Sequence, residues 1–327
     1  MTTVAVIGPG RVGTALALAL PRPAYEVVAV AGRPHSAHGG QAGGRLSAST
    51  ARFTALVPTA RAAPAAEAAA GAELVLVCVP DDLLAAVVLD AVEAGGATAG
   101  SRWVHTAGGV GLAPLRPAAA AGAAVAACHP AQTFPDPQTG AASLPGAAWA
   151  VTADDQDLGW ARVLVTDLRG SPVTLPDGAR PLYHSGLSVG ANATSAVVAL
   201  ARELLSGAGV ADPAAFLTPL ATTSATNAAQ RGAAALTGPV RRGDAGTVAE
   251  HLAAIERDLP ELAEAYLALA RLALDQARRA GLDPGPAAVL DELLRAHGAH
   301  GAHGAHDAHG GQGAHGAHGG RATSEGS

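Results

Sequence analysis

The feature that most constrains the fold of this chain is a glycine pattern close to the amino terminus. The apolar run Val4–Ile7 leads into Gly8, Gly10 and Gly13, spaced as G-x-G-x-x-G, and an alanine- and leucine-rich stretch follows. In such a strand–turn–helix the first glycine permits the tight turn, the second lets the backbone approach a pyrophosphate, and the third allows close packing. The pattern predicts a dinucleotide site formed by Gly8, Pro9, Gly10, Arg11, Val12 and Gly13. The alternative is a glycine-rich turn in an α/β domain that binds no cofactor.

The first half of the chain alternates short apolar runs with alanine-rich stretches, which is typical of a parallel sheet covered by helices on both faces. We expect strands at Val4–Ile7, Val27–Ala31, Leu74–Val79, Trp103–Thr106, Val125–Cys128, Trp149–Thr152 and Val173–Leu175. Between His35 and Ala63 the chain is rich in glycine, and we expect a loop with a weak strand near Leu56. The predicted fold class is α/β, a Rossmann doubly wound parallel sheet followed by an all-α helical domain.

After the turn at Pro176–Gly178 long apolar stretches follow, several of them opened by proline, which is tolerated in a first helical turn. We expect helices at about Pro181–Leu205, Pro213–Gln230, Ala245–Arg257, Pro260–Ala280 and Pro286–Ala296. The predicted regions are a nucleotide-binding domain at residues 1–178, a helical substrate and dimerisation domain at 179–296, and a tail at 297–327. Small residues on the first of these helices, Gly186, Gly190, Ala191 and Ala193, favour close packing and a homodimer through the helical domain.

The tail is a Gly-Ala-His repeat without large apolar residues, so it cannot offset the entropy of ordering and we expect disorder. Its histidines suggest weak Ni²⁺ or Zn²⁺ capture, and the simpler alternative is a dispensable repeat expansion.

Composition narrows the partners and the chemistry. The net charge of −6 with no basic block argues against nucleic acid as a partner, and all 21 basic residues are arginine because the chain has no lysine. Cys78 and Cys128 lie in apolar runs, so we expect reduced thiols. The chain enters its first strand at once, and no apolar run reaches the roughly 18 to 20 residues of a membrane span. We therefore expect no signal peptide, no membrane partner and a cytoplasmic location.

The end of the second expected strand bears on which dinucleotide binds. NAD sites usually place a carboxylate there for the ribose 2′-hydroxyl, whereas this chain has Arg33 and Ser36, which suit a 2′-phosphate and favour NADP(H) over NAD(H). The alternative makes Arg33 an ordinary surface charge. Val79, Pro80 and Thr106 end two further strands at the same edge and are expected to contact the cofactor, although the adjoining Asp82 also fits a simple helix cap.

Hydride transfer to a carbonyl or imine carbon requires a positioned proton donor, and histidine is the obvious donor in a chain without lysine. His129 follows an expected strand, and Pro130 would end that strand and present His129, Gln132 and Thr133 at the sheet edge. The alternative is a histidine bound to local backbone.

A second candidate group follows the start of the long helix. His184, Ser188 and Asn192 are spaced by four residues and would share one helical face, either toward a cavity or within an interhelical polar network. We expect His184, His129, Asn192 and Ser188 to be catalytic, with Thr133 and Gln132 binding substrate.

A further candidate is the loop Thr237–Asp244. Arg241 or Arg242 could hold a substrate carboxylate in bidentate fashion, and Asp244 would cap the next helix. The alternative is a capped loop exposed to solvent.

Taken together, these motifs resemble the Rossmann-like oxidoreductase family whose C-terminal part is the domain of unknown function 2520. The resemblance covers about residues 4 to 295 and rests on Gly8–Ala15, Val79–Asp82, His105–Gly108, His129–Phe134, Tyr183-His184 with Asn192, and Leu236–Asp244. The family looks related to pyrroline-5-carboxylate reductase, ketopantoate reductase, 6-phosphogluconate and β-hydroxyacid dehydrogenases, and F420-dependent NADP reductase. It implies a Rossmann domain, a helical second domain and use of NADP.

The chain departs from those relatives at the long helix. In the hydroxyacid and ketopantoate relatives a lysine begins this helix with an asparagine one turn on, whereas here His184 stands near the lysine position and Ser188 one turn on. We therefore expect NADPH-dependent reduction of a small oxo acid of the ketopantoate type or of an imine. The alternatives are a non-catalytic NADP-binding sensor or scaffold, and an activity like that of F420-dependent NADP reductase.

Overall fold

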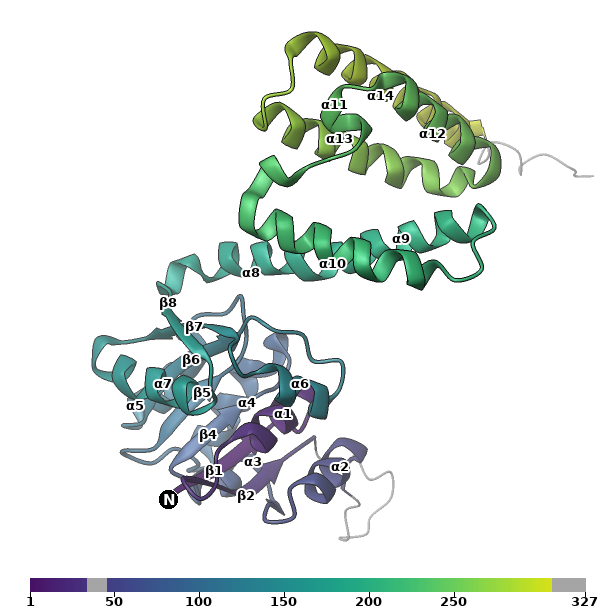
Figure 1. The fold of residues 1–327 in the computed structure, drawn as a ribbon. Helices are drawn as coiled ribbons and strands as arrows, with labels where there is room; N and C mark the ends of the chain where they lie inside the picture. Colours follow the sequence, from purple (N-terminus) through teal and green to yellow (C-terminus); the bar gives the residue numbers. More distant parts are fainter. Residues whose placement is uncertain (34–45, 308–327) are drawn as a thin grey trace, which may run out of the picture. The chain divides into compact units, whose positions relative to one another are not determined.

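The computed structural model describes residues 1–33 and 46–307, with side chains up to residue 298, and contains one eight-stranded sheet. The strand order is β3-β2-β1-β4-β5-β6-β7-β8 (Figure 1). The strands are β1 (Thr2–Ile7), β2 (Tyr25–Ala31), β3 (Arg61–Ala62), β4 (Leu74–Val77), β5 (Arg102–His105), β6 (Ala124–Pro130), β7 (Ala148–Ala153) and β8 (Ser171–Thr174). Neighbouring strands run parallel except β6 and β7, which are antiparallel. The expected α/β class and all seven expected strands are confirmed.

The strands form where both faces of the sheet are covered. Along β1, Val4 and Val6 belong to one buried cluster while Ala5 and Ile7 belong to another, because successive side chains of a strand point to opposite faces. The first cluster includes Leu16 of α1, and the second includes residues of α3 and α4. The helices of this half are α1 (Arg11–Ala19), α2 (Ala48–Leu56), α3 (Ala65–Ala70), α4 (Asp81–Glu93), α5 (Arg116–Ala120), α6 (Pro137–Ser143), α7 (Asp155–Asp167) and α8 (Arg180–Ser188).

The weak strand expected near Leu56 is wrong, because that residue ends helix α2. The Ser47 side chain accepts a hydrogen bond from the Thr50 backbone N–H and so caps the helix, and Phe53 is fully buried in the core. Most of the glycine-rich part of this stretch, residues 34–45, lies outside the described residues.

The chain divides into two compact units, Met1–Ala193 and Thr194–Ser327. The expected helix over Pro181–Leu205 forms as α8, a π-helical turn at Val189–Ala193, and α9, so the division falls inside this helical run whereas the sequence placed it at residue 179. The second unit comprises α9 (Thr194–Gly207), α10 (Pro213–Arg231), α11 (Pro239–Arg242), α12 (Ala245–Asp258), α13 (Ala263–Arg279) and α14 (Pro284–Asp307). Helix α14 continues past the expected start of the tail, and residues 308–327 are not among those described.

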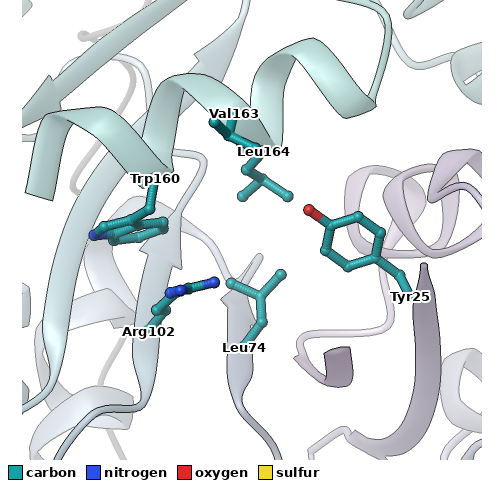
Figure 2. Close-up of a pocket in the computed structure, with 6 residues that line it drawn as sticks. All are labelled: Tyr25, Leu74, Arg102, Trp160, Val163 and Leu164. Atoms are coloured by element: carbon teal, nitrogen blue, oxygen red, sulfur yellow. The ribbon is translucent and has the colours of Figure 1, made fainter. Parts of the chain in front are cut away.

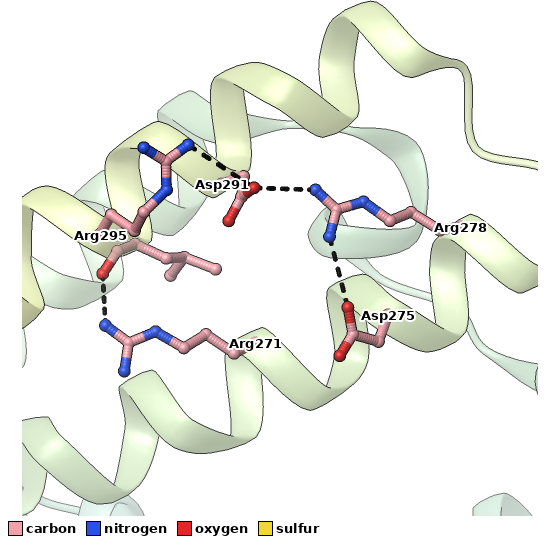
Figure 3. Close-up of polar contacts among 6 residues, drawn as sticks. Arg271, Asp275, Arg278, Asp291 and Arg295 are labelled. Atoms are coloured by element: carbon pink, nitrogen blue, oxygen red, sulfur yellow. Dashed lines mark hydrogen bonds and ion pairs between the residues drawn. The ribbon is translucent and has the colours of Figure 1, made fainter.

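Apolar packing and surface charges both join α13 to α14. Leu267 and Leu274 pack with Leu290 and Leu294 in the core of this unit. Figure 3 shows the polar contacts between the two helices: Arg278 of α13 forms an ion pair with Asp291 of α14 at 3.0 Å, and Arg271 donates to the Leu294 carbonyl oxygen at 2.8 Å. Arg295 also pairs with Asp291 at 3.6 Å, within α14. Exposed ion pairs contribute about 0 to 1 kcal/mol each, so the buried leucines hold these helices together.

Two further expectations concern membranes and metals. Across the described part of the chain, no helix has the length and apolarity needed to cross a bilayer. The same residues contain no group of three or more histidine, cysteine or acidic side chains placed to hold a metal ion, and both cysteines are free thiols as expected. The repeat that suggested Ni²⁺ or Zn²⁺ capture lies mostly outside the described residues.

Strand β6 depends on a buried carboxylate. Asp157, 8% exposed, accepts a hydrogen bond from the Val125 backbone N–H at 2.9 Å. Replacing Asp157 by alanine leaves that buried N–H without a partner, so we expect urea unfolding to show a loss of about 1 to 3 kcal/mol. Asp157→Asn keeps an acceptor oxygen and should lose less of the free energy of unfolding. Equal stability of the alanine variant and the wild type would contradict this role.

Candidate functional site

The three glycines of the amino-terminal turn differ in what a side chain would meet there. Gly8 has φ of +100°, and a Cβ there would lie 2.6 Å from the carbonyl oxygen of Cys78. A Cβ at Gly13 would meet the carbonyl oxygen of Gly8, so this glycine allows helix α1 to pack onto the turn. A Cβ at Gly10 would have nothing within 4 Å. The first and third glycines are therefore needed for packing, whereas the second leaves open space beside the backbone.

Helix α1 begins at this open position. Gly10 is its N-cap, its first turn holds no acidic residue, and no side chain caps it. The first backbone N–H groups of a helix lack partners and carry partial positive charge, which favours an anion such as a pyrophosphate. Pro9, Arg11 and Val12 surround the same turn, so the residues present fit the dinucleotide expected from the sequence.

The end of strand β2 is the region expected to select between the two dinucleotides. Arg33 is exposed directly after this strand, while Ser36 lies outside the described residues. A Cβ at Gly32 would meet the hydroxyl of Thr50 and lie 3.2 Å from Ser47 Oγ. Any side chain in place of Gly32 would therefore clash, so this position cannot carry a carboxylate.

Val79, Pro80 and Thr106 follow the carboxyl ends of β4 and β5, on the same side of the sheet as the glycine turn. Burial raises the pKa of Cys78 to about 12, opposed by a hydrogen bond with the Thr106 side chain, so this thiol stays protonated. Asp82 does not cap α4: Pro80 is the N-cap, and Asp82 lies within the first turn without a capping bond.

Strand β6 ends at Pro130, as expected, but His129 lies within the strand, whereas the sequence analysis placed it after the strand's last residue. In the antiparallel pairing with β7, His129 is opposite Ala150 and Pro130 opposite Trp149. The His129 Nδ1 is 2.9 Å from the hydroxyl of Tyr183, and the two rings meet edge to face with centroids 5.7 Å apart. A strand thus fixes the imidazole, and α8 supplies its partner.

His184 contacts both His129 and the loop after β5. The rings of the two histidines meet edge to face with centroids 5.8 Å apart. A Cβ at Gly108 would collide with the His184 ring and lie 2.9 Å from His129 Nε2, and one at Gly109 would lie 3.2 Å from His184 Nδ1. The structure therefore brings together the two histidines expected to be catalytic, with these glycines making the space for their rings.

Two buried residues of this cluster were not among the expected site residues. Arg180, the first residue of α8, is 0% exposed and donates to the Ala107 carbonyl oxygen at 2.8 Å and to Thr152 Oγ1 at 2.8 Å. His105, also fully buried, bonds the Gly111 carbonyl oxygen through Nε2 at 2.9 Å. His105 entered the sequence analysis only through the family resemblance, and so did Tyr183, which is partly buried. Arg180 was not singled out in the sequence, because nothing local to it signals burial.

Two imidazoles at this site, those of His129 and His105, are neutral at pH 7. Burial lowers the pKa of His129 to about 4, assisted by the charges of His184, Arg180 and His105. Burial likewise lowers the pKa of His105 to about 4, although its bond to Gly111 acts in the opposite direction. Burial raises the pKa of Tyr183 despite the nearby charge of Arg180. At neutral pH the site therefore holds uncharged hydrogen-bonding groups beside one buried guanidinium.

The other members of the expected polar stripe lie further along the same helical run. Asn192 Nδ2 donates to Ser188 Oγ at 3.3 Å, so these two side chains are joined. Asn192 belongs to the π-helical turn, whose wider winding changes the face that a residue eight positions after His184 would occupy in a regular α-helix.

Gln132 and Thr133 lie in the exposed loop after β6. The Gln132 amide donates to the Ser143 carbonyl oxygen at 3.2 Å and accepts from the Thr133 backbone N–H at 2.8 Å. Both ends of the Gln132 amide are therefore used in hydrogen bonds within the loop. Of the two side chains, the Thr133 hydroxyl is the one more available to a ligand.

Arg241 and Arg242 belong to the second unit, on the short helix α11 where a loop was expected. They line an open cavity of about 620 Å³ together with Thr237, Gly238 and residues 281–283. Arg241 donates to the Ala280 carbonyl oxygen at 3.0 Å, whereas Arg242 makes no ion pair or side-chain hydrogen bond with any described residue. Asp244 caps α12 through the Thr247 backbone N–H at 3.0 Å, as expected.

Comparison with known proteins agrees with this arrangement. Residues 1–130 match the model of a Rossmann-like domain, and residues 147–273 match the model of the domain of unknown function DUF2520. No curated protein matches the chain significantly.

Among solved structures, a putative NADP oxidoreductase from Bacteroides fragilis is similar over 83% of this chain and 97% of its own, with 23% identity and a TM-score of 0.66. A reductive aminase from Aspergillus terreus, solved with NADPH and ethyl levulinate, is similar over 89% and 99%, with 22% identity and a TM-score of 0.62. A protein from Thermotoga maritima covers 84% and 98%, with 20% identity and a TM-score of 0.60. At these identities the likeness shows a shared fold.

The two buried histidines make stability depend on pH. The unfolded chain takes up their protons near the ordinary pKa of 6.5, whereas the folded chain does so only near 4. Their contribution is therefore fully present above about pH 6.5 and is lost as the pH falls to about 4, on the order of 3 kcal/mol per histidine. Urea unfolding at pH 7 and pH 4.5 measures this loss. His129→Asn should lose less stability between pH 7 and pH 4.5 than the wild type. An equal loss in that variant would contradict the lowered pKa of His129.

Proposed function

Because the chain joins a Rossmann-like domain to a DUF2520 domain, we propose that it is an NADP(H)-dependent oxidoreductase that reduces an imine or a small oxo acid. The observation that carries this proposal is that the open glycine turn and the Tyr183–His129–His184 cluster both lie at the carboxyl ends of the parallel strands of one unit. In open α/β sheets ligands bind outside this edge.

Several observations support NADP(H) as the cofactor. The backbone space beside Gly10 and the uncapped start of α1 suit a pyrophosphate, and the exposed Arg33 suits a 2′-phosphate. Similar folds are described as a putative NADP oxidoreductase and as a reductive aminase in complex with NADPH. When bound, the nicotinamide supplies or accepts the hydride.

The chain itself would supply the proton for the substrate heteroatom. The Tyr183 hydroxyl and His129 Nδ1 share one hydrogen bond, so a proton given up by the phenol can be replaced from the imidazole. A pKa near 4 makes His129 neutral at pH 7, which favours a relay role over donation by an imidazolium. We therefore assign donation of the proton to Tyr183. The exposed His184 would take a proton from solvent and pass it through His129 back to Tyr183.

The remaining expected residues would orient the substrate. The joined Ser188 and Asn192 side chains offer hydrogen-bonding groups for a carbonyl or imine, and Thr133 offers a hydroxyl. Arg241 and Arg242 line a cavity within the second unit, and their expected role in binding a substrate carboxylate stays a prediction. The homodimer and the cytoplasmic location expected from the sequence stay predictions.

Gly10→Ala tests the cofactor site without disturbing the fold. Gly10 has extended backbone that any residue adopts, and a Cβ there meets nothing within 4 Å, so the melting temperature should not change. The added methyl would occupy the approach of the pyrophosphate, and we expect the Kd for NADPH to rise at least about tenfold in fluorescence titration.

Gly13→Ala is the matched control, because its Cβ collides with the Gly8 carbonyl oxygen and should lower the melting temperature. NADPH affinity unchanged in Gly10→Ala would overturn the placement of the cofactor.

Tyr183→Phe tests the proton donor. With NADPH and a panel of cyclic imines and 2-oxo acids, kcat should fall by about 10² to 10⁴ while the Kd for NADPH is unchanged. Tyr266→Phe is a matched control, because Tyr266 forms a similar pair with His251 Nδ1 at 2.8 Å in the second unit. A wild type that binds NADPH and oxidises it with none of the substrates would instead support a non-catalytic sensor.

A further inference from the structure

A second cavity lies at the opposite edge of the sheet from the glycine turn. Tyr25, Leu74 and Arg102 are the first residues of β2, β4 and β5, so they lie where these parallel strands begin, whereas the glycine turn follows a strand end. With three residues of α7 they line a cavity of about 220 Å³ (Figure 2). Those residues are Trp160, Val163 and Leu164. Nothing in the proposed reductase chemistry uses this cavity.

One wall of the cavity carries a positive charge without an acidic partner. The Arg102 guanidinium lies over the Trp160 ring, 5.8 Å from its centroid, and forms no ion pair or side-chain hydrogen bond with any residue that the structure describes. Stacking on an aromatic face holds the guanidinium in place and leaves its N–H groups available. A carboxylate could therefore bind here in bidentate fashion.

The facing wall carries a hydrogen-bond acceptor. The Tyr25 hydroxyl donates its proton to Asp167 Oδ2 at 2.6 Å, so the phenol oxygen has lone pairs and no free proton to offer a ligand. Figure 2 shows this oxygen and the Arg102 guanidinium pointing into the cavity from opposite sides. A ligand that satisfies both must therefore carry an acid at one end and an O–H or N–H donor at the other.

The remaining surfaces select a flat apolar body. Leu74 and Leu164 contribute aliphatic contacts, and Trp160 and Tyr25 contribute ring surfaces. The volume is below the roughly 300 to 1,000 Å³ typical of sites for drug-sized ligands, so it suits a single ring. The nearby Asp167 carboxylate would repel a second acidic group.

We propose that this amino-edge cavity binds a small aromatic monocarboxylate that carries a hydroxyl or N–H donor across the ring, with Arg102 holding the carboxylate and Tyr25 accepting from the donor. The site is separate from the proposed reductase site and would bind its ligand whether or not the cofactor site works.

The test is a calorimetric titration of the full chain with 4-hydroxybenzoate as the probe, compared with benzoate and 4-hydroxybenzamide. We expect saturable binding of 4-hydroxybenzoate, weaker binding of benzoate, which lacks the donor, and weaker binding of the uncharged amide. Arg102→Gln should weaken the binding of 4-hydroxybenzoate at least about tenfold, so that it binds no more tightly than 4-hydroxybenzamide. Tyr25→Phe should reduce its affinity to that of benzoate.

Arg162→Gln is the matched control, because Arg162 is also on α7 but bonds Thr174 and does not line the cavity. The affinity of the Arg162→Gln variant for 4-hydroxybenzoate should equal that of the wild type. The proposal is overturned if the wild type shows no saturable binding at millimolar probe, if Arg102→Gln binds like the wild type, or if Gly10→Ala abolishes binding and so places the probe at the cofactor turn.

Discussion

The arrangement of the candidate site depends on one guanidinium that is buried without a carboxylate. Arg180 donates to a backbone carbonyl after β5 and to the Thr152 hydroxyl of β7, with a longer contact of 3.5 Å to the Ala127 carbonyl of β6. A buried charge is costly unless it is hydrogen-bonded, so these acceptors fix where the first turn of α8 can lie. Tyr183 and His184 follow within that turn, and the same bonds therefore set their positions.

That fixed charge also determines the protonation of its neighbours. A cation beside His129 and His105 disfavours their protonated forms, adding to the effect of burial. With His129 and His105 neutral, Arg180 is a buried charge of this cluster, and the carboxylates of Asp177 and Asp81 interact with it electrostatically. Such a site favours substrates or transition states that develop negative charge, as a carbonyl oxygen does when a hydride is added to its carbon.

The sequence was sufficient where a local pattern alone determines the structure. All seven expected strands follow from apolar runs buried on both faces, and the three glycine roles at Gly8, Gly10 and Gly13 follow from their spacing. It was insufficient where tertiary contacts decide. Pairing with β7 keeps His129 inside β6, and the Ser47 cap with buried Phe53 makes a helix of the stretch ending at Leu56. Arg180 could not be identified as buried because its acceptors lie 28 to 73 residues away along the chain.

In a chain without lysine, positive charge and an exchangeable proton lie on different residues of this cluster. Arginine has too high a pKa to donate a proton at neutral pH, so Arg180 can provide positive charge but not general-acid catalysis. The Tyr183–His129 pair has the complementary property, since it holds an exchangeable proton and no charge. Arg180 thus holds the buried charge, while the proton that we propose a substrate receives lies in the hydrogen bond between Tyr183 and His129.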